Sequence, residues 1–181
     1  MRAEPRDDAE QVTQLLRDEP VTVEEERGGW LRVRTAYGYP GWIRDAFVEG
    51  SDPRLGSDTT RPHDGDPVQE ARSYLGAPYE WGGMTERGID CSGLVHMAYR
   101  RLGTLIPRDA DQQEEGGAPV DEPDARAGDL VTYGDESATH IAFWLGGGRI
   151  LHSTARDGVD GVVEEPEPFS LRATRRRFVR F

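Results

Sequence analysis

The sequence contains no lysine and no asparagine, and it has a single cysteine, Cys91. One cysteine cannot form an intrachain disulfide, and a zinc site built from several cysteines is excluded. Without asparagine, a catalytic cysteine–histidine pair must take its third member from histidine, glutamine or a carboxylate. We expect no cofactor and no metal.

Long apolar runs are also missing. We identify neither a transmembrane helix nor a signal peptide, and the chain starts with the polar segment MRAEP. We therefore expect a cytoplasmic protein without a membrane partner, or a secreted one if the true start lies upstream. The formal charge of −12 argues against a nucleic-acid partner. We interpret the run Arg175-Arg176-Arg177 as a solvated strand or tail.

The first 49 residues carry short β-type runs at 21–23 and 30–34, followed by a turn-rich segment at 37–41. Their order resembles a bacterial SH3-like domain, a small all-β barrel, although its usual first strand is missing. Either that strand is dispensable or the true start lies upstream. Residues 50–65 are rich in Asp, Gly, Pro, Ser and Thr, which is typical of a linker.

Residues 66–181 predict an α+β domain, with helices first and a sheet after them. Asp66-Pro67 is suited to start a helix in which Val68, Ala71 and Leu75 lie on one face and which ends at Gly76. A second helix is expected from Cys91 to Gly103. Strands are expected at 130–133, 140–145 and 149–153, the last two joined by a glycine hairpin. Residues 157–181 are expected to form a closing strand pair, without an assigned function.

Cys91 lies in the segment Asp90-Cys91-Ser92-Gly93, in the first turn of the second predicted helix. The free N–H groups and positive dipole end of a helix N-terminus stabilise a thiolate. Gly93 would also leave room for the substrate backbone. The alternative is an inert, buried cysteine that packs as a small apolar side chain.

Two histidines are suited to act as the base for this thiolate. In a hairpin that turns at the glycines, His140 and His152 lie opposite each other to within one register step. A one-residue bulge at the glycines would place both on the same face. We therefore predict that His140 is the base and His152 its orienting partner, whereas His63 and His96 are interpreted as solvated or packed surface residues.

Several groups of residues then occur in a fixed order that resembles the signatures of the NlpC family of cell-wall cysteine peptidases. The resemblance extends over about residues 66–155. The groups are residues 76–83 (GAPYEWGG), 90–95 (DCSGLV), 106–108 (IPR), 127–130 (AGDL), 140–142 (HIA) and 150–152 (ILH).

This resemblance implies a papain-like fold, in which the helix bearing the cysteine packs on an antiparallel sheet bearing the histidines. It also implies hydrolysis of the bond between γ-linked D-glutamate and the L-diamino acid of a peptidoglycan stem peptide. Tyr79 would lie by the nucleophile and support the oxyanion or the thiolate, and Trp81 would contact the substrate. The alternative is that both aromatic side chains only pack in the core.

An SH3-like domain joined to such a peptidase is similar to bacterial enzymes that act on trimmed muropeptides with a free N-terminal L-alanine, in cell-wall recycling. The resemblance implies that Glu4 and Tyr39 recognise the ammonium group, and Asp90 and Ser92 would complete the pocket. A buried ammonium group needs a carboxylate to offset its desolvation. The alternative for Glu4 is a solvated terminal residue.

Three other functions compete with this interpretation. An amidase or acyltransferase of papain-like fold could use the same Cys-His pair, and a wall-tethered hydrolase could act on intact peptidoglycan. A catalytically idle wall-binding protein is disfavoured by the intact set of Cys91, His140 and His152. The preferred diamino acid and the oligomeric state are left open.

Overall fold

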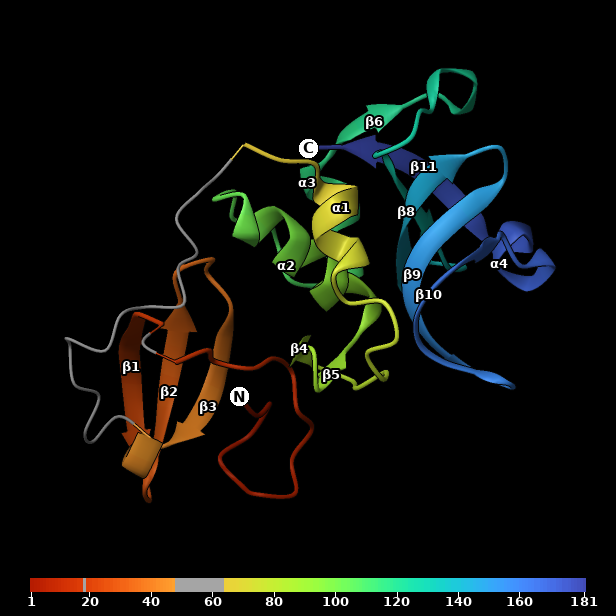
Figure 1. Cartoon of the computed structure of the whole chain (residues 1–181). Coiled ribbons are helices and arrows are strands. Elements are labelled where there is room, and N and C mark those ends of the chain that lie inside the picture. The colour runs from red at the N-terminus through yellow and green to blue at the C-terminus, as the bar shows by residue number, and fades with distance from the viewer. Residues whose placement is uncertain (18, 48–63) are drawn as a thin grey trace.

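The computed structural model describes residues 1–17, 19–47 and 64–181 (Figure 1). His63, residues 48 and 49 and the predicted linker, except for Asp64 and Gly65, lie outside the described residues. The predicted domain boundaries at 49 and 66 therefore stay a prediction. Within the described ranges, no helix has the length and apolar character needed to cross a membrane.

The N-terminal part of the chain forms an antiparallel sheet of three strands among the described residues. Its first strand is longer than the sequence predicted, because the turn after it consists of Gly28 and Gly29 alone, both with positive φ. Such two-residue turns match the twist of a hairpin. Trp30 and Val33 are buried in this sheet. The elements are β1 (Val21–Arg27), β2 (Trp30–Thr35), β3 (Pro40–Arg44) and the short helix η1 (Asp45–Phe47).

The rest of the described chain is an α+β unit, as the sequence predicted. A six-stranded sheet in the order β10-β9-β8-β7-β11-β6 stands beside the helices α1 and α2, which lie between it and the N-terminal sheet (Figure 1). The helices are α1 (Pro67–Arg72), α2 (Cys91–Arg101), α3 (Ala110–Gly116), η2 (Glu122–Asp124) and α4 (Phe169–Ala173). The strands are β4 (Met84–Thr85), β5 (Gly88–Ile89), β6 (Ala118–Val120), β7 (Leu130–Tyr133), β8 (His140–Gly146), β9 (Arg149–Arg156), β10 (Val159–Pro166) and β11 (Arg175–Arg180).

The large sheet has two apolar faces, because successive side chains of a strand point to opposite sides. Ile141 and Leu151 belong to the main core together with Leu94 of α2. Ala142 and Ile150, their neighbours in sequence, belong to a second and smaller cluster. Helix α2 contacts the strands β8 and β9, so it packs against the middle of the sheet.

The first helix of the α+β unit begins as predicted and ends earlier. Asp66 caps α1 by accepting a hydrogen bond from the backbone N–H of Val68 at 2.9 Å. Val68 and Ala71 are buried, but Leu75 lies beyond the helix and is 49% exposed. Tyr74 takes its place in the core. The prediction that Leu75 shares a helix face with Val68 and Ala71 is therefore wrong, because the helix ends at Arg72.

The C-terminal segment does form two strands, but they do not pair with each other. Strand β10 pairs with β9 at one edge of the sheet, whereas β11 lies between β7 and β6. Helix α4 connects them. Of the two alternatives for residues 175–177, the strand is the one that forms, and its arginines are ion-paired: Arg175 with Glu167 and Glu122, and Arg176 and Arg177 with Glu114. The run is therefore a strand of the sheet and not a tail, and of its three side chains only that of Arg177 is mainly in solvent, at 51% exposed.

The interpretation of His96 as a solvated or surface residue is wrong. Its side chain is fully buried in α2, and its Nδ1 lies 2.8 Å from the backbone oxygen of Ile106, to which it must donate. Its Nε2 finds no partner among the described residues. Burial, helped by the charges of Arg108 and Arg100, lowers the pKa of His96 to about 4.

A neutral, buried His96 makes the protein sensitive to acid. In the unfolded chain His96 takes up a proton near pH 6.5, but in the folded protein only near pH 4. The contribution of neutral His96 to the free energy of unfolding is therefore complete above about pH 6.5 and falls as the pH drops towards 4. We expect His96→Gln, which keeps a donor for Ile106, to reduce the slope of unfolding free energy against pH in this window. The reduction should approach ~1.4 kcal/mol per pH unit. Urea titrations from pH 7 to 4.5 would measure it, and equal slopes would contradict the assignment.

Candidate active site

Cys91 is the first residue of α2, as predicted, and Asp90 is the N-cap of that helix. The Asp90 backbone is extended, and its Oδ1 accepts a hydrogen bond from the backbone N–H of Gly93 at 2.6 Å. A Cβ added at Gly93 would approach the backbone oxygen of Gly83 to 2.4 Å. Internal packing therefore requires glycine at this position. The sequence-based prediction gave a different reason, namely that Gly93 leaves room for the substrate.

The sulfur of Cys91 lies in a largely buried environment. Burial and the neighbouring Asp90 carboxylate raise the pKa of the thiol to about 12, whereas the backbone N–H groups of Ile141 and Ser92 act in the opposite direction. The resting thiol is thus protonated at neutral pH and needs a base to form the nucleophile. The proximity of the Ile141 amide places the sulfur beside the start of β8, one residue from His140.

His140 and His152 are hydrogen-bonded to each other, with 2.7 Å between Nε2 of His140 and Nδ1 of His152. The predicted bulge is present: the register between β8 and β9 shifts between Trp144 and Gly146. After the shift Phe143 pairs with Leu151, so His152 is opposite residue 142 and shares a face with His140. Without this register shift, His152 would be opposite residue 143 and would face away from His140.

The electrostatics of the pair suit a neutral base. Burial and the neighbouring His152 lower the pKa of His140 to about 3. Burial also lowers the pKa of His152, although the hydrogen bond to the Glu165 carboxylate and its charge act to raise it. Both imidazoles are therefore uncharged at neutral pH, so His140 has a ring nitrogen free to accept a proton, although its burial makes it a weaker base than a solvated histidine.

Two aromatic residues precede the nucleophile along the chain. Burial raises the pKa of Tyr79, and so do the Asp90 carboxylate and Cys91 in its thiolate form, so the hydroxyl stays protonated close to the sulfur. A protonated hydroxyl there can donate to a developing oxyanion. Trp81 is 59% exposed, and its indole N–H donates to Oε1 of Glu10 at 2.7 Å. The core alternative therefore does not apply to Trp81, and its substrate contact stays a prediction.

Both oxygens of the Asp90 carboxylate are already occupied inside the protein. Oδ2 accepts from the backbone N–H of Gly82 and from Nη2 of Arg108, each at 2.7 Å, and Oδ1 accepts from Nη1 of Arg108 at 2.9 Å. Arg108 is 1% exposed, and its Nη1 also donates to Oγ of Ser92 at 2.9 Å. Asp90 and Ser92 thus brace the start of α2 through Arg108, a residue for which the sequence predicted no role of its own.

Arg108 also connects the nucleophile helix to the N-terminal part of the chain. Its Nε donates to Oγ of Thr13 at 3.2 Å. Two further contacts cross the same interface: the backbone N–H of Met84 donates to Gln14 at 2.9 Å, and Arg100 forms an ion pair with Glu19. The segment before β1 is therefore part of the framework around Cys91.

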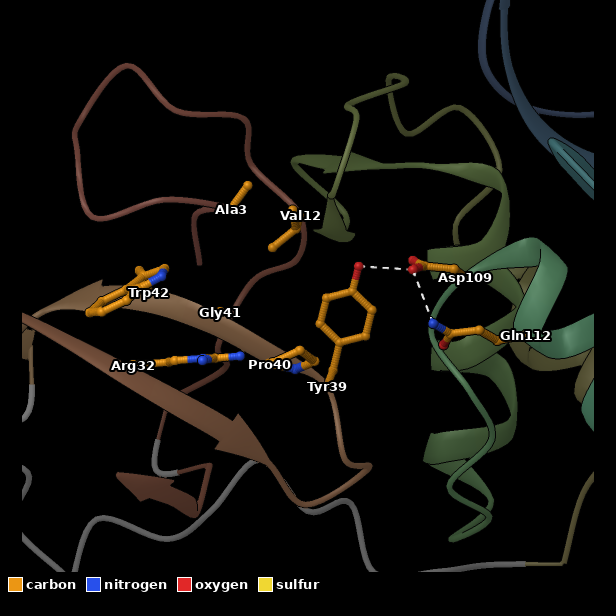
Figure 2. Close-up of a pocket in the computed structure, with 9 residues that line it drawn as sticks. All are labelled: Ala3, Val12, Arg32, Tyr39, Pro40, Gly41, Trp42, Asp109 and Gln112. Atoms are coloured by element: carbon orange, nitrogen blue, oxygen red, sulfur yellow. Dashed lines mark hydrogen bonds between the residues drawn. The ribbon is translucent and has the colours of Figure 1, made fainter. Parts of the chain in front are cut away.

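A cavity of about 320 Å³ lies between the N-terminal sheet and α3 (Figure 2). Tyr39 points across it, and its hydroxyl donates to Oδ2 of Asp109 at 2.9 Å (Figure 2). Asp109 follows Arg108 directly, so this cavity is connected through Arg108 to the start of α2. The cavity is lined by Ala3, Val12, Arg32, Tyr39, Pro40, Gly41, Trp42, Asp109 and Gln112.

The predicted pocket of Glu4, Tyr39, Asp90 and Ser92 is not assembled as one cluster. The Glu4 carboxylate is 63% exposed and pairs with Arg6 at 3.3 Å, Tyr39 contacts Asp109, and Asp90 and Ser92 contact Arg108. The two carboxylates differ in their surroundings, because Asp90 is buried against Arg108, which the fold brings to it, whereas Glu4 is exposed and pairs with Arg6, two residues along the chain. The binding role of each residue stays a prediction.

Besides Arg108, the sequence did not point to two further residues with a place in the site. Asp109 meets Tyr39 across the cavity, and its position directly after the IPR group was the one available signal. Glu165 accepts a hydrogen bond from Nε2 of His152 at 2.9 Å. No sequence signal could have found Glu165, because its position depends on the register between β9 and β10.

The sequence is similar to two known domain families. The family model described as the NlpC/P60 family matches residues 76–175, and that of the bacterial dipeptidyl-peptidase Sh3 domain matches residues 1–46. The γ-D-glutamyl-L-lysine dipeptidyl-peptidase of Bacillus cereus is 34% identical over 126 residues, which is 67% of this chain and 37% of that protein. The bifunctional muramidase/DL-endopeptidase CwlT of Bacillus subtilis is 35% identical over 69% of this chain and 39% of that protein.

The chain thus spans about two fifths of the length of these curated relatives. A crystal structure of an NlpC/P60 family protein from Bacillus cereus is similar with a TM-score of 0.79, covering 93% of this chain and 81% of that chain at 22% identity. This likeness confirms the predicted fold class, an α+β papain-like unit preceded by an SH3-like unit.

Proposed function

Since the chain belongs to the NlpC/P60 family, we propose that it is a cysteine endopeptidase that hydrolyses peptidoglycan peptides. The observation that carries this proposal is the position of Cys91. It starts a helix next to the strand that begins with His140, and His140 is hydrogen-bonded to His152 at 2.7 Å. A nucleophile, a base and a partner for the base are the parts that acyl transfer requires.

The proposed reaction begins with transfer of the Cys91 proton to His140. The thiolate attacks the scissile carbonyl carbon, and the Tyr79 hydroxyl donates to the oxygen that becomes negative. His140 then protonates the leaving amine and the C–N bond breaks, which leaves a thioester on Cys91. A water molecule, deprotonated by His140, hydrolyses this thioester and restores the free thiol.

For the finer specificity we propose the bond between γ-D-glutamate and the L-diamino acid, in trimmed peptides with a free N-terminal L-alanine. The names of the Bacillus relatives support the γ-D-glutamyl bond. The ammonium group would bind at the cavity of Tyr39 and Asp109. Burial raises the pKa of Asp109 despite the opposing hydrogen bond from Tyr39 and charge of Arg108, so a further cation there would stabilise its charged form. The cytoplasmic location stays a prediction.

This specificity predicts a large effect of blocking the substrate amine. We expect L-Ala-γ-D-Glu-diaminopimelate to be cleaved at least roughly a hundredfold more efficiently than its N-acetylated form, because acetylation leaves the Asp109 carboxylate without its cation. Asp109→Asn should reduce this ratio strongly. Glu4→Gln tests the other carboxylate that the resemblance assigns to the ammonium group, and it should reduce the ratio less than Asp109→Asn does, because the Glu4 carboxylate is exposed and paired with Arg6.

The measurement is kcat/KM on both substrates for the three proteins. Equal rates of the wild type on both substrates would contradict the amine pocket and favour a wall-tethered hydrolase of intact peptidoglycan. A loss of discrimination in Glu4→Gln but not in Asp109→Asn would return the carboxylate role to Glu4. Parallel assays on sacculi and on lipid amides would reveal an amidase or acyltransferase.

A further inference from the structure

A carboxylate on the edge strand of the sheet extends the histidine pair by one member. Glu165 of β10 accepts a hydrogen bond through Oε1 from Nε2 of His152 at 2.9 Å, and its other oxygen forms an ion pair with Arg156. His152 itself is fully buried. The chain of contacts therefore runs from His140 through His152 and Glu165 to Arg156.

The sheet register explains why Glu165 reaches this position. His152 is opposite Val163 and Ile150 is opposite Glu165 in the β9–β10 pair. Glu165 is therefore the diagonal neighbour of His152 on the same face, a position that a long side chain can span. Glu164, one residue earlier, is on the opposite face, where it pairs with Arg72 at 2.5 Å.

The Glu165 carboxylate determines which nitrogen of each histidine donates and which accepts. An ionised carboxylate can only accept, so Nε2 of His152 must carry a hydrogen and Nδ1 must present a lone pair. That lone pair can only accept from Nε2–H of His140. The lone pair of His140 is then on Nδ1, which is left to accept the thiol proton.

We infer that Glu165, held by Arg156, is a positioning residue. It fixes the tautomers of His152 and His140 in the form needed for proton transfer from Cys91. This inference rests on the proposed cysteine-peptidase function. The carboxylate also supplies a negative charge that stabilises the histidine pair when it accepts the thiol proton.

The ionisation state of Glu165 agrees with this role. Burial acts to raise its pKa, but the hydrogen bonds from Arg156 and His152 outweigh burial and hold the pKa below its ordinary value. Glu165 is therefore an acceptor throughout the neutral range. A glutamine of the same shape could present either its oxygen or its amide hydrogens to His152, and would not enforce one tautomer.

The test compares Glu165→Gln with Glu164→Gln, a matched change of one carboxylate on the same strand. Loss of an outer partner of a functional histidine costs about ten- to a hundredfold, so we expect kcat of Glu165→Gln to fall by that factor with KM little changed. Glu164→Gln should stay within about twofold of the wild type. In a His152→Ala background, Glu165→Gln should have no further effect, because the residue through which it acts is gone.

A second readout requires no substrate. ¹⁵N imidazole NMR at pH 7 should show the Nε2–H tautomer for both His140 and His152 in the wild type and in Glu164→Gln, and a tautomer mixture in Glu165→Gln. Unchanged tautomers in Glu165→Gln, or an equal kcat loss with and without His152, would overturn the inference. If the wild type cleaves no peptide, the proposed function fails, while the NMR result still decides the role of Glu165.

Discussion

Replacement of Cys91 with alanine is expected to abolish peptide hydrolysis and to leave the folded structure intact. The chain has no second cysteine that could replace the nucleophile. Loss of a nucleophile costs roughly 10⁴-fold or more in kcat. The side chain is small and 6% exposed, so its truncation to alanine removes one sulfur from the edge of the core. Steady-state kinetics and a thermal melt would measure both effects.

Cys91→Ser is the matched control, because it keeps the shape of the side chain and removes the thiol. It should be as inactive as Cys91→Ala, since the pair of His140 and His152 is arranged for a thiol and not for the much less acidic hydroxyl. A purified Cys91→Ala protein that retains more than a trace of hydrolysis would contradict the mechanism. Alkylation with iodoacetamide should inactivate the wild type, and the single cysteine makes the modified site unambiguous.

The second large effect is expected at Arg108, and it concerns stability. Arg108→Met should lower the free energy of unfolding by about 3–5 kcal/mol, because it leaves the buried Asp90 carboxylate without its counter-charge. The guanidinium also donates to Ser92, to Thr13 and to the backbone oxygen of Gly83. Urea denaturation at pH 7 would measure the loss.

A double variant separates the buried charge from the lost packing. Asp90→Asn combined with Arg108→Met removes both charges and keeps a side-chain oxygen that can cap Gly93. It should be more stable than Arg108→Met alone, although less active if the start of α2 shifts. A single variant Arg108→Met within about 1 kcal/mol of the wild type would show that the pair of Asp90 and Arg108 does not brace the helix.

The elements that carry the proposed chemistry could be predicted because their signals are local. The start of α2 is encoded by the cap residue Asp90, and the pairing of His140 with His152 follows from a glycine hairpin with a one-residue bulge. Each signal lies within about a dozen residues of sequence. Local signals of this kind fix helix ends and hairpin registers without knowledge of the rest of the fold.

The residues around these elements could not be predicted, because their contacts join distant parts of the chain. Glu165 reaches His152 only through the register of β9 and β10, and Tyr39 meets Asp109 only when the N-terminal sheet packs beside α3. Asp90 looked free to bind an ammonium group, but the fold brings Arg108 to it. A carboxylate in a sequence does not reveal whether an internal cation already neutralises it.

Product identification on a defined tripeptide tests the central proposal most directly. The wild type would be incubated with L-Ala-γ-D-Glu-diaminopimelate, with Cys91→Ala in parallel, and the products identified by mass spectrometry. We predict the dipeptide L-Ala-γ-D-Glu together with free diaminopimelate from the wild type, and no product from Cys91→Ala. Release of free L-alanine, no cleavage by the wild type, or the same products from both proteins would contradict the proposal that Cys91 attacks the γ-D-glutamyl carbonyl.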